Sequence, residues 1–407
     1  MPPSIDRGQS GKHRLGLNRS FRPWLIFLLG LLTVALLVGP GRGWLPRQGS
    51  TAPHHDHPRP NQPAIASRFD PYIPQQPVKR AAAANPAKTV DLGLHVENVY
   101  QLSLKDKTFW AEGWYWLKWP KAVNDIIVKH KIPLDGIVEF TNQIEAGSFN
   151  IQQEQADSVL QPDGTYYQLL RFSGKFYIDD LDLAAFPFQR LALPITMELK
   201  PDELSCYANS PYGCISLKDD SDLRGSVIGE YATINGYDVK GAYIKQYSHQ
   251  YNTTFGTPGA SAFDSIDTSL VYGTSWTTAF WQYIFPLLVL VGLLLIAPSL
   301  PGSLGDVRLA IPTTIMLTLI FLQLGYRAEL PALSYVTYLD WLYIYAYIIS
   351  IVTFVLFCWG INAFAKASDD GGEADSLRAI NRVDLLSQVC GGVGLLLLLS
   401  ISLFLRG

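Results

Sequence analysis

The 407-residue chain lacks a strong charge imbalance and lacks the common motifs of enzymes. Its formal net charge is −3, so the composition gives no reason to expect a nucleic-acid partner. The sequence contains no G-x-S-x-G motif, no H-E-x-x-H motif and no phosphate-binding loop, and it offers no convincing set of nucleophile and base. These absences argue against an enzyme, and neither a cofactor nor a metal site is expected.

Cysteine is also scarce, with four residues in the chain. Cys206 and Cys214 lie close together in a polar, turn-rich stretch, where they could close a small disulfide loop if this part faces an oxidising compartment. The disulfide is favoured over two free thiols. Cys358 and Cys390 lie in apolar segments, and each is expected to be a separate buried thiol that fills space as a small apolar side chain.

Hydrophobic runs are rare in the first 88 residues. Residues 1–22 are polar and basic, and residues 23–40 contain one apolar run, Trp24–Val38. A basic segment before such a run is the pattern of a secretory signal peptide, and the run is short of the roughly 20 apolar residues that a membrane span needs. No clean small-x-small cleavage motif follows, so an uncleaved signal anchor is the alternative to the favoured cleaved signal.

Residues 41–88 are rich in Pro, Gln, Ala and His and show no periodicity, which predicts a disordered linker. The tract His54-His55-Asp56-His57 could bind a metal weakly. A solvated polar tract is favoured, because nothing around these residues would fix the geometry of metal ligands.

Residues 89–276 have the pattern of an all-β domain. The stretch V-D-L-G-L-H-V at 90–96 alternates apolar and polar residues, as a half-buried strand does, and the aromatic-rich stretch 109–119 alternates too. Turn residues such as Pro-Asp-Gly at 162–164 separate the strand-like runs, and many short strands with such turns predict a β-sandwich or barrel. The other runs are Tyr166–Phe172, Lys175–Ile178, Leu191–Leu199, Tyr237–Tyr247 and Ser265–Tyr272.

Residues 277–407 contain four apolar runs, each long enough to cross a membrane as a helix. They predict a four-helix transmembrane domain. The runs are Ala279–Ala297, Leu309–Tyr326, Leu339–Ala363 and Leu385–Leu405.

The connectors between these runs predict the orientation of the chain in the membrane. The middle connector, residues 328–338, has no Lys or Arg, whereas the first and third connectors carry basic residues. By the positive-inside rule the first and third connectors are cytoplasmic. The β domain and the C-terminus then face outward, into the periplasm or the exterior of a bacterial inner membrane. The basic residues are Arg308 in the first connector and Lys366, Arg378 and Arg382 in the third.

The second membrane run and its flanks carry a distinctive motif. Residues 306–340 read D-V-R-L-A-I-P-T-T-I-M-L-T-L-I-F-L-Q-L-G-Y-R-A-E-L-P-A-L-S-Y-V-T-Y-L-D. Further motifs are Phe186-Pro187-Phe188, the spacing of five between Trp114 and Trp119, and Pro286 in the first membrane run. With these motifs, residues 90–405 resemble the pentameric ligand-gated ion channels, the Cys-loop receptor superfamily, and especially its prokaryotic branch.

The chain departs from the family at two positions that usually carry charge. No cysteines flank Phe186-Pro187-Phe188, as is usual for prokaryotic members, and the Asp that the family places after this motif is Gln189. The family's Arg before the first membrane helix falls on or near Thr274. Losing only one charge of a pair would leave a costly unpaired group, so the loss of both is physically consistent and puts the usual coupling ion pair in doubt.

The resemblance implies a homo-oligomer, a pentamer, embedded in membrane lipid, with a small or ionic agonist bound between subunits among aromatic residues. Packing is the favoured role for two of the matching aromatic residues, Trp114 and Phe140. The family's tryptophan after the Phe-Pro-Phe motif falls on Lys200, which argues against a quaternary-amine ligand. Nearby acidic residues Asp219, Asp220 and Asp222 could bind calcium, although a solvated loop is favoured. The candidate ligand-binding residues are Trp114, Phe140, Glu198, Lys200, Tyr247 and Tyr251.

The second membrane run is expected to line the pore. Polar side chains in a bilayer are costly unless they face protein or water, and steps of three and four residues align them on one stripe. The alternative is a bundle helix whose Thr hydroxyls bond to its own backbone; the resemblance favours the pore. Pro312 could bend this helix or simply be tolerated there. The stripe comprises Asp306, Ala310, Thr313 and Thr314 as pore-lining and selectivity residues, and Leu317, Phe321 and Leu324 as the gate.

Asp306 and Arg308 differ by about 200° around the helix axis, so only one can face the pore. The stripe selects Asp306, whose ring of carboxylates would favour cations, although a helix N-terminus also suits a carboxylate. The resemblance further implies that Phe186, Pro187 and Phe188 press on the turn that follows the pore helix, at Leu330, Pro331, Tyr335 and Asp340. A cation-selective channel gated from outside is therefore predicted, with a non-conducting membrane receptor as the alternative and a structural anchor as the weakest hypothesis.

Overall fold

The structure is a computed structural model that describes residues 67–69, 88–200, 204, 215–220, 227–250, 262–301, 304–369 and 373–405. These residues belong to two compact units. The helical unit contains Leu288–Phe321 and Leu342–Leu399, and the β-rich unit contains the preceding residues up to Leu287 together with Leu322–Trp341. The signal segment, the Cys206–Cys214 pair and Tyr251 lie outside the described residues.

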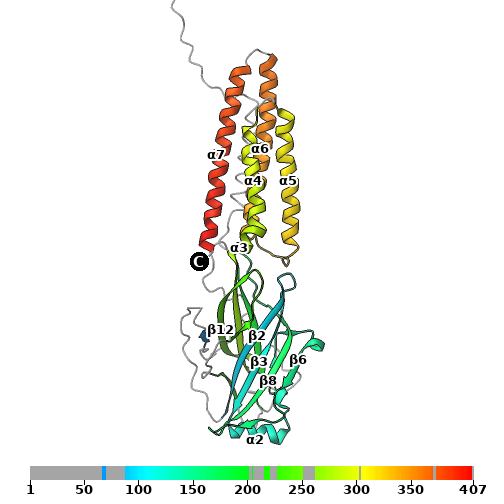
Figure 1. Cartoon of the computed structure of the whole chain (residues 1–407), viewed down its shortest axis with the longest axis vertical. Coiled ribbons are helices and arrows are strands. Elements are labelled where there is room, and N and C mark those ends of the chain that lie inside the picture. The colour runs from blue at the N-terminus through cyan, green and yellow to red at the C-terminus, as the bar shows by residue number, and fades with distance from the viewer. Residues whose placement is uncertain are drawn as a thin grey trace, which may run out of the picture. The chain divides into compact units, whose positions relative to one another are not determined.

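Two sheets form the β-rich unit (Figure 1). One has the strand order β1-β12-β13-β9-β4, and the other has the order β10-β2-β3-β8-β5, with β11 paired to β2 and with β6 and β7 paired to β8. Parallel pairing to β2 is seen for β10 and β11. The strands are β1 (Ser67–Phe69), β2 (Thr89–Ser103), β3 (Thr108–Trp119), β4 (Val138–Phe140), β5 (Gln143–Ile144), β6 (Asn150–Gln153), β7 (Val159–Leu160), β8 (Tyr166–Tyr177), β9 (Arg190–Leu199), β10 (Ser216–Asp219), β11 (Ile228–Tyr231), β12 (Tyr237–Gln250) and β13 (Ala262–Thr274).

An aromatic core joins the two sheets. Successive residues of a strand point to opposite faces, and in β3 every second residue from Phe109 to Trp119, including Tyr115, is buried, while the residues that alternate with them are partly exposed. Phe140 of β4, in the other sheet, meets Tyr115 edge-on at 5.4 Å and lies 5.2 Å from Phe172 of β8, measured between ring centroids. The predicted alternation over residues 109–119 is therefore confirmed.

Two strands differ from the sequence-based expectation. The runs 166–172 and 175–178 form the single strand β8, in which Gly174 is required because a Cβ there would lie 2.0 Å from the Phe149 ring. Strand β1 falls inside the predicted disordered linker, where three residues add to the edge of a sheet by backbone pairing to β12. Backbone pairing needs no side-chain periodicity, so the pattern could not reveal it.

A short helix, α2 (Lys121–His130), was not expected between β3 and β4. Its buried residues Val123, Ile126 and Ile127 follow the helical spacing of three and four. Pro120 stands at the N-cap, before the helix, where its missing N–H costs no hydrogen bond.

Four helical stretches are long and apolar enough to cross a membrane: Trp276–Ser299, Gly305–Arg327, Tyr338–Ser368 and Ala374–Ser400. The chain is thus a multi-pass membrane protein with a β-rich region followed by four long apolar helices. The first stretch contains α3 (Trp276–Ala279), a π-helical turn (Phe280–Ile284) and α4 (Phe285–Ile296). The others are α5 (Gly305–Arg327), α6 (Tyr338–Asp369) and α7 (Glu373–Leu405).

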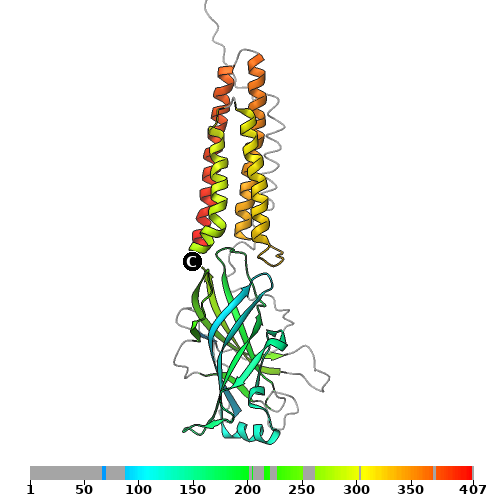
Figure 2. The ribbon, with the colours of Figure 1, turned by 45° about the vertical axis from the view of Figure 1, so that its right-hand side comes forward.

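Helices α4 to α7 lie side by side in the helical unit (Figure 2). The Ser350 hydroxyl of α6 donates to the Pro312 carbonyl of α5 at 3.0 Å, so α5 continues through Pro312 and packs there. The Tyr345 hydroxyl of α6 donates to the Gly391 carbonyl of α7. At Gly394 a Cβ would lie 2.8 Å from that hydroxyl, so glycine permits this close approach.

Helices α6 and α7 extend beyond the predicted apolar runs because polar residues at their ends remain helical. Both membrane cysteines are free, but Cys390 is exposed on the surface of the helical unit. The expectation of a buried thiol is therefore wrong for Cys390, and Cys358 is only partly buried.

A carboxylate near one end of the core links the two sheets. Asp264 of β13 accepts a hydrogen bond from the Leu217 amide of β10 at 3.1 Å, and Gln246 of β12 donates to the Leu217 carbonyl at 2.5 Å. Burial raises the pKa of Asp264 to about 6, although the hydrogen bonds from Leu217 and Ser216 favour the charged form. Burial thus makes ionisation of Asp264 harder in the folded protein than in the unfolded chain, although the carboxylate is charged at pH 7 and above.

We expect Asp264→Asn to stabilise the β-rich unit near pH 7.5. A carboxyl whose pKa is higher folded than unfolded contributes stability below about pH 4, and this contribution is lost as the pH rises to about 6. The loss corresponds to about 2–3 kcal/mol, so the variant should melt several degrees higher at pH 7.5 and should match the parent more closely at pH 4.5. Thermal unfolding in detergent, with the exposed Asp238→Asn as control, measures this; parent-like melting of Asp264→Asn at pH 7.5 would contradict it.

Candidate functional site

The predicted pore stripe of α5 lies on the face of the helix that the rest of the chain leaves uncovered. Three large apolar side chains of the stripe are well exposed, with Leu317 at 56%, Phe321 at 64% and Leu324 at 62% of their full accessible area. Asp306, Ala310, Thr313 and Thr314 are exposed as well. The opposite stripe packs inside the chain and comprises Arg308, Pro312, Ile315, Leu319 and Tyr326.

Two threonines of α5 bond to the backbone of their own helix, as the alternative hypothesis of a bundle helix that lines no pore requires. The Thr313 hydroxyl donates to the Leu309 carbonyl at 2.6 Å, and the Thr318 hydroxyl donates to the Thr314 carbonyl at 3.0 Å. Such bonds lower the cost of a hydroxyl in an apolar setting. They do not serve Asp306, an exposed carboxylate in the first turn of the helix.

Arg308 points into the helical unit, as the 200° separation from Asp306 predicts. Its side chain is 4% exposed, and its guanidinium donates to the Asp384 carboxylate of α7 at 2.5 Å. The polar end of the stripe therefore presents a carboxylate, while the nearby cation is neutralised inside the protein.

Within the β-rich unit, the segment around Phe186-Pro187-Phe188 holds the start of α6. The Tyr338 amide donates to the Ala184 carbonyl at 2.8 Å, and the Leu339 amide donates to the Phe186 carbonyl at 3.0 Å. The first amides of a helix have no partner inside the helix, so this loop satisfies two of them. The Leu183 amide in turn donates to the Tyr335 hydroxyl at 2.8 Å.

Aromatic rings reinforce this junction. Phe186 meets Tyr283 edge-on at 4.9 Å and stacks at 6.1 Å on Tyr326, near the end of α5. Phe188 stacks on Trp276 at 5.1 Å, with ring planes 14° apart, and lies 6.0 Å from Tyr338. The motif therefore touches the ends of three helices through side chains as well as through backbone.

A buried carboxylate organises the turn between α5 and α6. Asp340 accepts hydrogen bonds from the amide and hydroxyl of Thr337, each at 2.8 Å, and from the hydroxyl of Tyr326. Arg327 pairs with it at 2.7 Å. Leu330 is buried beside this network, whereas Pro331 is only partly covered. Four of the predicted coupling residues, Phe186, Phe188, Tyr335 and Asp340, thus have contacts at the start of α6 and the turn before it, whereas no hydrogen bond or ring contact joins Pro187 to Pro331 among the described residues.

Two neutral residues, Gln189 and Thr274, stand at the positions where the family resemblance would place a coupling ion pair. The Thr274 amide donates to the Gln189 carbonyl at 3.2 Å, with the Thr274 hydroxyl at 3.4 Å from the same oxygen. Gln189 and Thr274 are therefore neighbours, as the family's Asp and Arg would be, and a backbone bond joins them in place of two charges.

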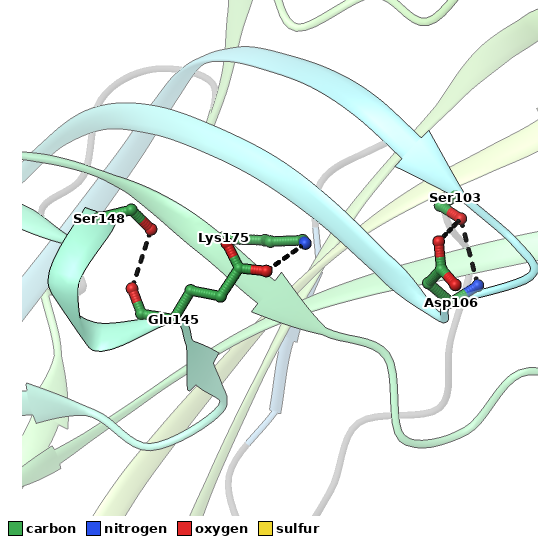
Figure 3. Close-up of polar contacts among 5 residues, drawn as sticks. All are labelled: Ser103, Asp106, Glu145, Ser148 and Lys175. Atoms are coloured by element: carbon green, nitrogen blue, oxygen red, sulfur yellow. Dashed lines mark hydrogen bonds and ion pairs between the residues drawn. The ribbon is translucent and has the colours of Figure 1, made fainter.

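The turn between β2 and β3 is joined to Ile178, just after β8, and was not expected from the sequence. The Ser103 hydroxyl donates to Asp106 at 2.8 Å, and the Asp106 amide donates back to the Ser103 oxygen at 3.1 Å (Figure 3). The Lys107 carbonyl accepts from the Ile178 amide at 2.8 Å. The same view shows the Lys175 side chain of β8 paired to the Glu145 carboxylate at 2.6 Å, which ties the turn after β5 to β8. In the sequence, the Ser-x-x-Asp pattern at 103–106 is the signal that could have predicted this turn.

Two candidate ligand residues are buried, and Phe140 has the packing role that was favoured for it. Phe140 is 2% exposed in the aromatic core between the sheets, so its ring is not open to a ligand. Glu198 is 1% exposed and accepts hydrogen bonds at 2.6 Å from Ser265 and from the ring of His249. Neighbouring strands supply its donors, and Glu198 is therefore not free to bind a zwitterion.

The remaining candidates are divided between the two sheets. Trp114 lies on the outer face of the β2-β3-β8 sheet, with the Arg171 guanidinium 5.4 Å from its ring and its indole N–H 3.3 Å from Glu154. Tyr247 lies on β12 in the other sheet, with Lys245 5.5 Å from its ring. Lys200 is exposed. One chain does not bring these residues together into an aromatic cage.

The acidic patch does not form an open cation site. The Asp220 carboxylate is buried and accepts from the Trp116 indole and from Lys118, each at 2.8 Å. Asp222 lies outside the described residues. Within the part of the chain that the structure describes, no group of three or more His, Cys, Asp and Glu is arranged to hold a metal ion.

No family model matches this chain, and no curated protein matches it. The assignment of its function therefore depends on the chemistry of the α5 stripe and of the junction around Phe186-Pro187-Phe188.

The junction is tested by a double-mutant cycle between Phe188 and Trp276. A stacked aromatic pair contributes about 0.5–1.5 kcal/mol beyond burial, so Phe188→Leu and Trp276→Leu should be non-additive by that amount in the free energy of unfolding. Denaturant titrations of the single and double variants in detergent measure it. The same cycle with Phe188 and Trp110, which stacks on Tyr100 elsewhere, should be additive; additivity in the first cycle would disprove the coupling.

Proposed function

We propose that this protein is a subunit of a homopentameric, ligand-gated, cation-selective ion channel in a bacterial inner membrane. The β-rich region serves as a sandwich-type sensor domain in the periplasm or exterior. The observation that carries the proposal is the exposed stripe of α5, which is polar at its N-terminal end and apolar toward its C-terminal end.

The physical argument is the cost of this stripe in lipid. A carboxylate at Asp306 would be expensive against acyl chains and is inexpensive against water, whereas the Thr313 hydroxyl, bonded to the Leu309 carbonyl, adds less to this cost. The opposite stripe of α5 is already used for packing. Copies of the chain that turn their α5 stripes toward a common axis would enclose water and remove the cost, and the resemblance to pentameric channels gives five copies.

The apolar part of the stripe supports a gate. A ring of Leu317, Phe321 and Leu324 side chains narrows the pore and excludes water, and a dry constriction stops ions without a physical plug. The Asp306 ring at the other end attracts cations and repels anions. Selectivity and gating are thus assigned to separate turns of one helix.

The junction supports control of this gate from the sensor. Phe186 and Phe188 contact the residues around both ends of the turn between α5 and α6, so a displacement of the sheets would be transmitted to α5. Trp114 and Tyr247 lie on different sheets of one chain and would share a ligand only if neighbouring subunits meet there. A non-conducting receptor would use the same junction, but it has no need of a polar stripe on α5.

Selectivity is tested with Asp306→Asn. Removing the charge should lower the ratio of sodium to chloride permeability, because the ring of carboxylates would be lost. Reversal potentials of purified protein in bilayers with asymmetric NaCl measure this ratio, and Asp375→Asn, at an exposed carboxylate on α7, is the control. An anion-selective parent, or an unchanged ratio in Asp306→Asn, would contradict the assignment.

The gate is tested with Leu317→Ser. A hydroxyl at this ring should let water enter and raise the basal current without any agonist. Leu396→Ser changes an equally exposed leucine on α7 and should leave the basal current unchanged. The gate lies elsewhere if Leu317→Ser and the parent show the same basal flux in liposomes.

A further inference from the structure

The ion pair between Arg308 and Asp384 is the main directional contact between the N-terminal end of α5 and the rest of the helical unit. The guanidinium and carboxylate approach to 2.5 Å, and the two side chains are 4% and 8% exposed. The Arg308 guanidinium also lies 4.2 Å from the centre of the Phe357 ring on α6. One side chain of α5 is therefore held by two other helices at once.

The rest of the buried stripe in this unit constrains rotation only weakly. Ile315 and Leu319 are apolar and pack without a preferred direction, and the Ser350 hydroxyl binds a backbone carbonyl, that of Pro312. An ion pair with a hydrogen bond, in contrast, has a defined geometry. The angle of α5 about its own axis is thus set at this end by Arg308.

Stability alone does not account for this pair. Taking two charges out of water costs about as much as their attraction returns, so buried pairs are often replaceable by apolar side chains without loss. Breaking such a pair is costly, because one charge is left buried and alone. A buried pair of this kind is best suited to fixing one arrangement among several of similar energy.

The rotation of α5 decides which charge faces the exposed stripe. Arg308 and Asp306 are separated by about 200° around the helix, so holding Arg308 inward holds Asp306 outward. If Arg308 were released, its long side chain could reach the exposed face and place a cation beside the carboxylate. The identity of the charge at the mouth of the stripe therefore depends on α7.

We propose that Asp384 is a positioning residue for ion selectivity: by pairing with Arg308 it keeps that cation out of the pore and turns Asp306 toward it. This inference rests on the proposed channel function. It assigns to α7, which carries no residue of the stripe, a defined role in selecting ions.

The test compares Asp384→Asn with Arg308→Met/Asp384→Leu. Asp384→Asn strands Arg308, so the sodium-to-chloride permeability ratio should fall about tenfold or more. The double variant removes both charges and keeps an apolar packing, so its ratio should return to the parental value. Asp375→Asn, at an exposed carboxylate on the same helix, is the matched control. A parental ratio in Asp384→Asn overturns the proposal, and so does a double variant that fails to recover.

A second measurement does not depend on conduction. In a background with Cys206, Cys214, Cys358 and Cys390 all replaced by alanine, the cysteine of Asp306→Cys is labelled with a water-soluble thiol reagent. The labelling rate should fall several-fold when Asp384→Asn is added. Equal rates overturn the proposal even if Asp384→Asn folds poorly. A parent that carries no current, combined with slowed labelling, overturns the channel function and leaves the positioning role of Asp384 intact.

Discussion

The structure depends on the way α6 begins. A helix starts with amides that have no partner of their own, and leaving one of them buried and unpaired costs about 1–3 kcal/mol. Here the carbonyls of Ala184 and Phe186 accept from the first two amides of α6, so a loop between β8 and β9 completes a membrane helix. The loop and the helix start therefore form together, and a displacement of one is a displacement of the other. Phe186 and Phe188 extend this dependence to Tyr326 and Trp276.

Helix α5 is constrained by charge at both ends. Arg327 pairs with Asp340 near the C-terminal end, and Arg308 pairs with Asp384 near the N-terminal end. Both arginines are anchored to carboxylates of other helices, which leaves Asp306 as the charged residue of the exposed stripe. The α5 residues between these two anchors, 309–326, carry no charge. In the proposed channel, a helix fixed by charge at its two ends is suited to a gate that opens by a slight tilt.

The sequence was sufficient for features that repeat and insufficient for features that depend on a partner strand. Alternation identified the long strands, and apolar length identified the four helices, because each is a property of consecutive residues. Phe140 and Trp114 are both aromatic residues in strands, yet one fills the core and the other lies on an outer face, since the pairing of β4 with β9 decides which face is buried. Glu198 looked available for a ligand because Ser265 and His249, which occupy it, lie more than fifty residues away. The helix α2 and strand β1 are too short to give a clear pattern.

The neutral pair at Gln189 and Thr274 changes how the junction transmits force. An ion pair at this position would depend on salt and on the protonation of its acid, whereas the bond between the Thr274 amide and the Gln189 carbonyl depends on neither. The junction keeps one ion pair, that of Arg327 with Asp340, whose buried carboxylate also accepts hydrogen bonds from Thr337 and Tyr326. The other contacts of the junction described here are backbone bonds and aromatic contacts, whose strength varies little with ionic conditions. In the proposed channel, a sensitivity of gating to pH can also arise in the sheets, where burial raises the pKa values of carboxylates such as Asp264 and Asp267.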